Sequence, residues 1–166
     1  MKIKKKQYAL IFLIFIFFSN IPEISLSLIF LKEPNDMIIK DHFWKDTEGN
    51  FIYSQGGIFK FEETYYWYGV HYKGAEIYAA NPIKKNDDTT FVSIACYLSK
   101  DLFNWKFEND VLTPKSKGWV EAGWVGRMGV AYIKKSKQYI LITQHNDSIL
   151  FATCSTPKGD FEVRNI

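Results

Sequence analysis

The sequence contains few residues that could form disulfides or bind a metal ion. It has two cysteines, Cys96 and Cys154, and three histidines among 166 residues. No histidine or second cysteine lies at zinc-ligand spacing from either cysteine, so the sequence predicts no metal site and no other cofactor. Each cysteine falls in an apolar stretch typical of a strand, where a free thiol packs like a small hydrophobic side chain. We therefore expect two free thiols, although an exported protein could oxidise them.

The chain also lacks a charge excess outside its first residues. Its formal net charge is +3. Four lysines within residues 2–6, set against Glu23, already supply +3, so the rest of the chain is close to neutral. No cluster of basic residues remains to attract a phosphate backbone. The composition therefore argues against a nucleic-acid partner.

Long hydrophobic runs are scarce as well. The unbroken apolar run Ala9–Phe18 is about half of the roughly 20 residues that a membrane-spanning helix needs. Lysines precede this run, polar residues follow it, and Ser25 and Ser27 offer small side chains for cleavage. This order predicts a signal peptide over residues 1–27 and a secreted, periplasmic or cell-surface protein with no stable membrane insertion after cleavage. The alternative is an uncleaved membrane anchor.

What the chain has in abundance is aromatic residues arranged in short strand-like runs. After a connector at residues 28–50, the stretch 56–69 reads as a hairpin with a turn at Glu62-Glu63 and an aromatic second strand, Tyr65–Gly69. The glycine pair Gly56-Gly57 before the hairpin indicates a place where another group approaches the backbone closely.

The same pattern occurs a second time. Gly57-Ile58 can be laid over Gly129-Val130, and Tyr65–Trp67 over Gln138–Ile140. Each copy continues with further strands, expected at 91–98, 106–108, 148–154 and after 161, and with long loops at 70–90 and 109–125. Repeated four-stranded units are typical of a β-propeller. We therefore predict an all-β fold in which residues 51–166 form a partial β-propeller of about two four-stranded blades, fewer than the usual 4–8.

Several spaced motifs resemble one enzyme family. They are Trp44-x-Asp46-Thr47-x-Gly49-Asn50, Gln55-Gly56-Gly57-Ile58, Tyr65-Tyr66-Trp67-Tyr68-Gly69, Cys96-Tyr97-x-Ser99-x-Asp101-Leu102-x-Asn104-Trp105, Gly126-Arg127-x-Gly129-Val130-x-Tyr132 and Leu150-Phe151-Ala152-Thr153-x-Ser155-x-Pro157-x-Gly159-x-Phe161. Together they resemble glycoside hydrolase family 43, and more narrowly its branch of exo-acting β-1,3-galactanases.

The resemblance implies a five-bladed propeller that holds a galactan-type polysaccharide in an axial funnel and cuts it with inversion. Such hydrolysis uses an acid and a base that flank the bond, and the family carries both in later blades than residues 1–166 cover. This sequence also departs from the family. It has Gln55 for a histidine, Val70-His71 where a glutamate is common, and Gly126-Arg127-Met128 for Glu-Arg-Pro.

Glu121 is the candidate catalytic residue within the chain. It lies between Trp119 and Trp124 in the second long loop. An apolar wall would raise the pKa of its carboxyl group, as a general acid requires, and Glu121 could replace the glutamate missing beside Arg127. The alternative is a solvated loop glutamate.

The candidate substrate-binding residues are polar or aromatic groups at the expected strand ends: Gln55, Gly56, His71, Trp124, Arg127 and His145. An amide or imidazole can bond a sugar hydroxyl, and a tryptophan can stack on a pyranose. Each has a structural alternative: an inter-blade bridge for Gln55, backbone bonding for the histidines, inter-blade packing for Trp124, and a loop brace for Arg127.

The sequence therefore supports three readings. The first is an exported glycosidase-like protein that acts on a β-linked galactan, with an oligo- or polysaccharide as its partner. The second is a non-catalytic glycan-binding propeller. The third is a truncated product that does not fold, because two blades alone leave long sheet edges open.

Overall fold

The structure is a computed structural model that describes residues 44–81, 83, 88–119 and 121–165. The predicted signal peptide, and the connector up to residue 43, lie outside the described residues. Within the described part of the chain, no helix is both long and apolar enough to cross a membrane.

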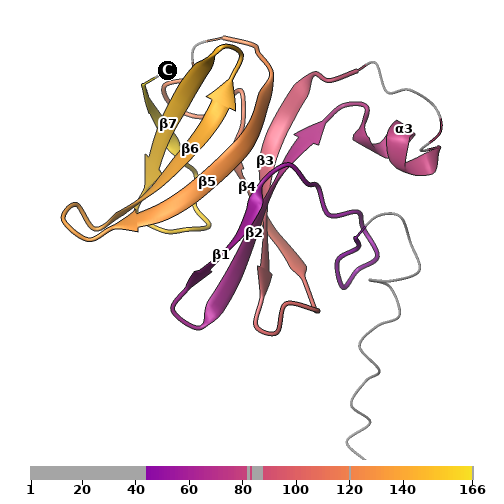
Figure 1. The fold of residues 1–166 in the computed structure, drawn as a ribbon, viewed down its shortest axis with the longest axis horizontal. Coiled ribbons are helices and arrows are strands. Elements are labelled where there is room, and N and C mark those ends of the chain that lie inside the picture. The colour runs from indigo at the N-terminus through magenta and orange to yellow at the C-terminus, as the bar shows by residue number, and fades with distance from the viewer. Residues whose placement is uncertain (1–43, 82, 84–87, 120, 166) are drawn as a thin grey trace, which may run out of the picture. The chain divides into compact units, whose positions relative to one another are not determined.

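The described residues form two separate four-stranded antiparallel sheets and one short helix (Figure 1). The N-terminal sheet contains β1 (Gly57–Phe61), β2 (Thr64–Tyr72), β3 (Phe91–Ser99) and β4 (Lys106–Leu112). The C-terminal sheet contains β5 (Val125–Ile133), β6 (Gln138–His145), β7 (Ser148–Cys154) and β8 (Glu162–Asn165). In each sheet the strands follow sequence order. The predicted all-β fold with two four-stranded blades of a propeller is confirmed.

The structure differs from the predicted elements mainly at the loops. The first long loop contains a helix, α3 (Ala75–Ala80), that the sequence reading missed. Strands β2, β4 and β5 are longer than expected, and β5 begins at Val125, the last residue of the expected second loop. Phe51 forms an isolated bridge with Lys45 ahead of the first sheet.

The N-terminal sheet is apolar on both faces. One of them, the Trp67 face, carries Trp67 and Tyr97, with Trp105 packed against them. The rings of Trp67 and Trp105 meet edge to face at a centroid distance of 5.3 Å. Ile52 belongs to the same cluster and the ring of Trp44 meets that of Trp67 edge to face, so the segment before β1 covers this face.

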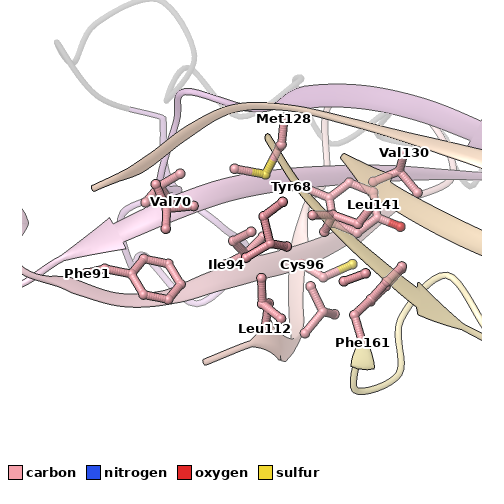
Figure 2. Close-up of a cluster of buried hydrophobic side chains, with 14 of the residues drawn as sticks. Tyr68, Val70, Phe91, Ile94, Cys96, Leu112, Met128, Val130, Leu141 and Phe161 are labelled. Atoms are coloured by element: carbon pink, nitrogen blue, oxygen red, sulfur yellow. The ribbon is translucent and has the colours of Figure 1, made fainter. Parts of the chain in front are cut away.

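The opposite Tyr68 face packs against the C-terminal sheet. Tyr68 and Cys96 of the N-terminal sheet share one buried cluster with Val130, Leu141 and further residues of the C-terminal sheet (Figure 2). The Tyr68 hydroxyl also donates a hydrogen bond to the carbonyl of Pro157 at 2.5 Å. This shared core joins the two sheets. Both cysteines are free thiols, Cys96 fully buried in this core and Cys154 packed at its margin.

The strand register corrects the sequence overlay by one residue. Ile58 pairs with Trp67, and its counterpart Val130 pairs with Leu141, not with Ile140. The reason is the turn, because residues 62–63 connect β1 to β2 whereas residues 134–137 connect β5 to β6. A shift of one residue reverses which face a strand side chain occupies. Leu141 is thus the counterpart of Trp67, and unlike faces of the two sheets meet.

The remaining face of the C-terminal sheet, the Ile142 face, is apolar and partly exposed. Ile133, Ile142 and Ile149 are 40%, 38% and 56% exposed. By register, Ile142 is the counterpart of Tyr68, which is completely buried in the N-terminal sheet. The two sheets therefore have the same kind of apolar face, which is covered in the N-terminal sheet and partly exposed in the C-terminal sheet.

Two aspartates, Asp46 and Asp101, hold the tight turns of the first blade. Asp46 accepts hydrogen bonds from the amides of Glu48 and Asn50, both at 2.9 Å. Asp101 accepts bonds from the amides of Phe103 and Asn104 at 2.9 and 2.8 Å. Burial tends to raise the pKa of Asp101, but these bonds outweigh it and lower the pKa to about 2.

The shared core gives a first prediction. Leu141→Ala removes a fully buried side chain and is expected to lower the free energy of unfolding by about 2–4 kcal/mol. Ile142→Ala, the next residue of β6 on the exposed face, is expected to cost under about 1 kcal/mol. Urea denaturation followed by tryptophan fluorescence measures both. Equal losses would contradict the assignment of the two faces.

The Asp101 turn predicts a pH dependence. Because the folded-state pKa is lowered, the carboxylate stabilises the fold above its ordinary pKa of about 4, and this contribution is lost as the pH falls towards 2. Since Asp101 is exposed, solvent screening reduces the contribution to about 0.5–1 kcal/mol. Thermal unfolding of wild type and Asp101→Asn at pH 5 and pH 2.5 tests this. The wild type should lose more stability between the two pH values than the variant, and parallel losses would refute the role of Asp101.

Candidate functional site

The candidate residues gather at one end of the two sheets, where they join. The segment before β1, the end of β2, the start of β5 and the end of β6 all meet there. The amide of Arg127 donates to the carbonyl of Gln55 at 3.1 Å, and the amide of Asn146 donates to the carbonyl of Trp124 at 2.9 Å. These backbone bonds fix the relative positions of residues that are far apart in sequence.

Two of the candidates have an unusual backbone conformation. Gln55 has φ of 67° and Arg127 has φ of 51°, in the left-handed region that costs energy for residues other than glycine. The two are bonded to each other through their backbones. Strained residues of this kind are concentrated at functional sites. Both are exposed, so the strain is not a by-product of core packing.

Tyr72 ties Gln55 to the C-terminal sheet. Its side-chain oxygen lies 3.2 Å from Gln55 Oε1 and also contacts the backbone carbonyl of Val125. Burial raises the pKa of the Tyr72 hydroxyl to about 12. Gln55 therefore bridges the two sheets, as its structural interpretation predicted. The residue is nevertheless exposed to solvent.

A first cavity, of about 690 Å³, lies beside the second long loop. Its walls include Glu121, Trp119 and Trp124 together with Thr90 and Phe91. Trp119 stacks on Phe91 with ring centroids 5.1 Å apart and packs against the core, so it serves packing as well as the cavity wall. Glu121 is exposed on this wall.

A second cavity, of about 450 Å³, lies between the segment before β1, the end of β2 and helix α3. Tyr53, Gln55, Tyr72 and Glu76 line it, and Trp124 borders both cavities. Trp124 thus stands between the wall that carries Glu121 and the wall that carries Gln55. An aromatic lining with a few polar groups is the usual make-up of a small-molecule site.

His71 lies next to the second cavity, and its ring forms a hydrogen bond with a side chain, not with the backbone. Its Nε2 lies 2.9 Å from Glu76 Oε1, and its ring stacks on Tyr53 with centroids 4.1 Å apart. The Tyr53 hydroxyl donates to the same Glu76 oxygen at 2.9 Å. Partial burial works to raise the pKa of Glu76, but hydrogen bonds from its own backbone, Tyr53 and His71 prevail and the pKa is lowered.

His145 lies beneath the surface instead of at an open rim. It is 1% exposed, and its Nε2 has no hydrogen-bond partner among the described residues. The ring meets Trp119 edge to face at 5.3 Å. A Cβ on Gly123 would lie 2.7 Å from this nitrogen, so Gly123 separates His145 from the loop surface.

Position 56 has no room for a side chain, because the backbone of β2 passes too close to it. A Cβ built there would lie 1.8 Å from the carbonyl oxygen of Tyr68. The close approach expected at Gly56-Gly57 therefore exists, and the approaching group is a strand of the same sheet. Arg127 contributes its backbone to the junction with Gln55, which agrees with the bracing reading.

The structure thus brings Gln55, Arg127 and Trp124 together, with Glu121 and His71 on opposite sides and His145 below. Sequence reasoning missed Tyr53, Tyr72 and Glu76. The alanine-rich run Ala75–Ala80 carried a helix signal that could have located Glu76. Within the described ranges, no cluster of three or more His, Cys, Asp or Glu side chains could hold a metal ion.

No family model and no curated protein sequence matches the chain. Solved structures do match. An exo-β-1,3-galactanase from Phanerochaete chrysosporium, in complex with β-1,3-galactotriose, is 27% identical with a TM-score of 0.60 over 75% of this chain and 28% of that one. An exo-β-1,3-galactanase from Clostridium thermocellum is 26% identical with a TM-score of 0.57, over 74% and 26%.

A β-1,3-galactosidase of glycoside hydrolase family 43, in complex with galactodeoxynojirimycin, is also similar at 26% identity and a TM-score of 0.55, over 74% of this chain and 36% of that one. The two sheets are therefore blades of a glycosidase-type propeller. The resemblance to family 43 and its galactanase branch is confirmed at the level of structure. The chain spans about 28% of the length of the P. chrysosporium enzyme.

Gly56 supplies a prediction for the site. Gly56→Ala places a methyl group against the Tyr68 carbonyl and is expected to destabilise the protein by about 3 kcal/mol. Gly129→Ala is the matched control, because no atom lies within 4 Å of its added Cβ, and it should change stability by under about 1 kcal/mol. Thermal unfolding of both variants measures the difference. Tolerance of alanine at Gly56 would contradict the close packing of this junction.

Proposed function

We propose that this chain forms part of a glycoside hydrolase-like protein that acts on a β-linked galactan-type polysaccharide. The observation that carries the proposal is the structural match to exo-β-1,3-galactanases over about three quarters of the chain. Structures of the P. chrysosporium enzyme were solved with β-1,3-galactotriose and with galactose. The motifs that resemble the family occur in both described blades, in the same order.

The chemistry of the site supports a carbohydrate partner. A pyranose offers an apolar ring face and several hydroxyl groups, so its site combines aromatic surface with donors and acceptors. Trp124 borders both cavities, and Gln55 offers an amide within the second one. We propose Gln55, Gly56, His71, Trp124, Arg127 and His145 as the sugar-binding set, in which Gly56 and His145 support the others from behind.

For hydrolysis we propose Glu121 as the carboxyl group that this chain supplies. It lies on the wall of the first cavity with Trp119 and Trp124. Inverting hydrolysis needs an acid and a base about 6.5–9.5 Å apart, with a water between them. By the family resemblance, both of these belong to later blades, and Glu121 would take the place of the glutamate that is missing beside Arg127.

A second candidate function, non-catalytic glycan binding, is favoured by one feature. Gly126-Arg127-Met128 stands where the family commonly has Glu-Arg-Pro, and Glu121 is exposed instead of enclosed by apolar groups. Such a protein would keep the sugar-holding wall without the chemistry. We further propose export, on the strength of the lysine-rich start and the short apolar run at residues 9–18.

A binding experiment tests the sugar site. Trp124→Ala should weaken the affinity of the chain for β-1,3-galactotriose about tenfold, because it removes the aromatic wall common to both cavities. Trp44→Ala is the matched control, since Trp44 contacts Trp67 edge to face on the Trp67 face of the sheet, and should leave the affinity unchanged. Isothermal titration calorimetry gives the dissociation constants. Equal affinities for wild type and Trp124→Ala would remove Trp124 from the site.

A turnover experiment separates the two functions. Reducing-sugar release from β-1,3-galactan, measured on a full-length product that carries the later blades as well, is expected from a hydrolase. It should be lost in Glu121→Gln while binding of galactotriose persists. Binding without release by the wild type would favour the non-catalytic function. Release that is unchanged in Glu121→Gln would remove Glu121 from the chemistry.

A further inference from the structure

The geometry points to Glu76 as a residue that selects sugars by their charge: the cavity between β2 and α3 admits neutral and amino sugars and disfavours acidic ones. This inference rests on the proposed carbohydrate function and names the ligand class within it. It concerns the second cavity, whereas Glu121 lines the first.

The carboxylate of Glu76 is held in place through one oxygen. Tyr53 Oη and His71 Nε2 both contact Oε1, each at 2.9 Å. The two rings that hold it are themselves stacked, with an interplanar angle of 8°. A carboxylate fixed in this way keeps one orientation without the entropy cost of ordering it when a ligand binds.

The Glu76 carboxylate is also accessible from the cavity. Glu76 lines the second cavity, and its side chain is 57% exposed. Its carboxylate can therefore accept a hydrogen bond from a hydroxyl or ammonium group of a ligand, whereas it repels a ligand carboxylate at the same distance.

The charge around this cavity is negative. Glu76 is the charged side chain on its wall, and no lysine or arginine of the described residues lines it. The other lining groups are aromatic or neutral, among them Tyr53, Tyr78 and Trp124. When His71 is neutral and donates its Nε2 proton, the His71–Glu76 pair carries one negative charge. An acidic sugar would be repelled by this charge.

The size of the effect follows from the exposure of Glu76. Two unit charges about 5 Å apart interact by about 1 kcal/mol in a water-like dielectric, and this corresponds to a factor of about five in affinity. We therefore expect each change of ligand charge by one unit to change the dissociation constant about fivefold.

Three methyl β-glycosides that share the galactose ring serve as probes: the neutral galactoside, the cationic galactosaminide and the anionic galacturonide. Binding to the full chain is measured by ligand-observed NMR at pH 7, where the amino group of the galactosaminide is largely protonated. The expected order of affinity is galactosaminide, galactoside, galacturonide. In Glu76→Gln, which keeps the shape and an oxygen acceptor, this spread should shrink to under twofold.

The matched control is Glu63→Gln, a turn glutamate that is 87% exposed and pairs only loosely with Lys60 at 3.6 Å; it should keep the wild-type spread. Equal affinities for the three probes in the wild type, or a spread that survives in Glu76→Gln, would overturn the inference and leave the proposed function standing. Binding of β-1,3-galactotriose without binding of any probe would also overturn it. If galactotriose fails to bind as well, the proposed function fails with it.

Discussion

The structure depends on a sheet that is apolar on both faces. In β2, Trp67 and Tyr68 are neighbours that point to opposite sides, and both are buried. A sheet of this kind is stable only when two layers cover it, since each exposed face would leave large aromatic surfaces in water. The segment before β1 covers the Trp67 face and the C-terminal sheet covers the Tyr68 face. Unlike faces meet, so the arrangement can repeat around an axis, as propeller blades do.

The sequence predicted the two sheets well because strand signals are local. Runs such as Tyr65–Gly69 and Ser148–Cys154 are rich in aromatic and apolar residues, are bounded by turn residues, and lie where expected. The register of the repeat was wrong by one residue, since the length of a hairpin turn is not evident from an aromatic run. That single residue decides whether Leu141 or Ile140 enters the core.

The site was predicted in part, and the reason for the misses is equally physical. Gln55, Trp124 and Arg127 lie at strand ends, and antiparallel order brings strand ends to one edge, so their meeting was foreseeable. The partners of His71 were not, because they come from the segment before β1 and from a helix inside a loop. Contacts between loops depend on the tertiary fold, which local patterns do not encode. The burial of His145 beneath Gly123 likewise depends on the tertiary fold of the second loop.

The hydroxyl group of Tyr72 has one proton and faces two carbonyl oxygens, one in the backbone of Val125 and one in the amide of Gln55. A single proton can satisfy only one of them. When Val125 receives it, the Gln55 oxygen either receives no hydrogen bond from Tyr72 or turns outward so that the amide nitrogen faces the phenol. In both arrangements this amide oxygen can accept a hydrogen bond from another group. Under the proposed function a sugar hydroxyl would be that donor, so the junction that joins the two blades would also take part in binding.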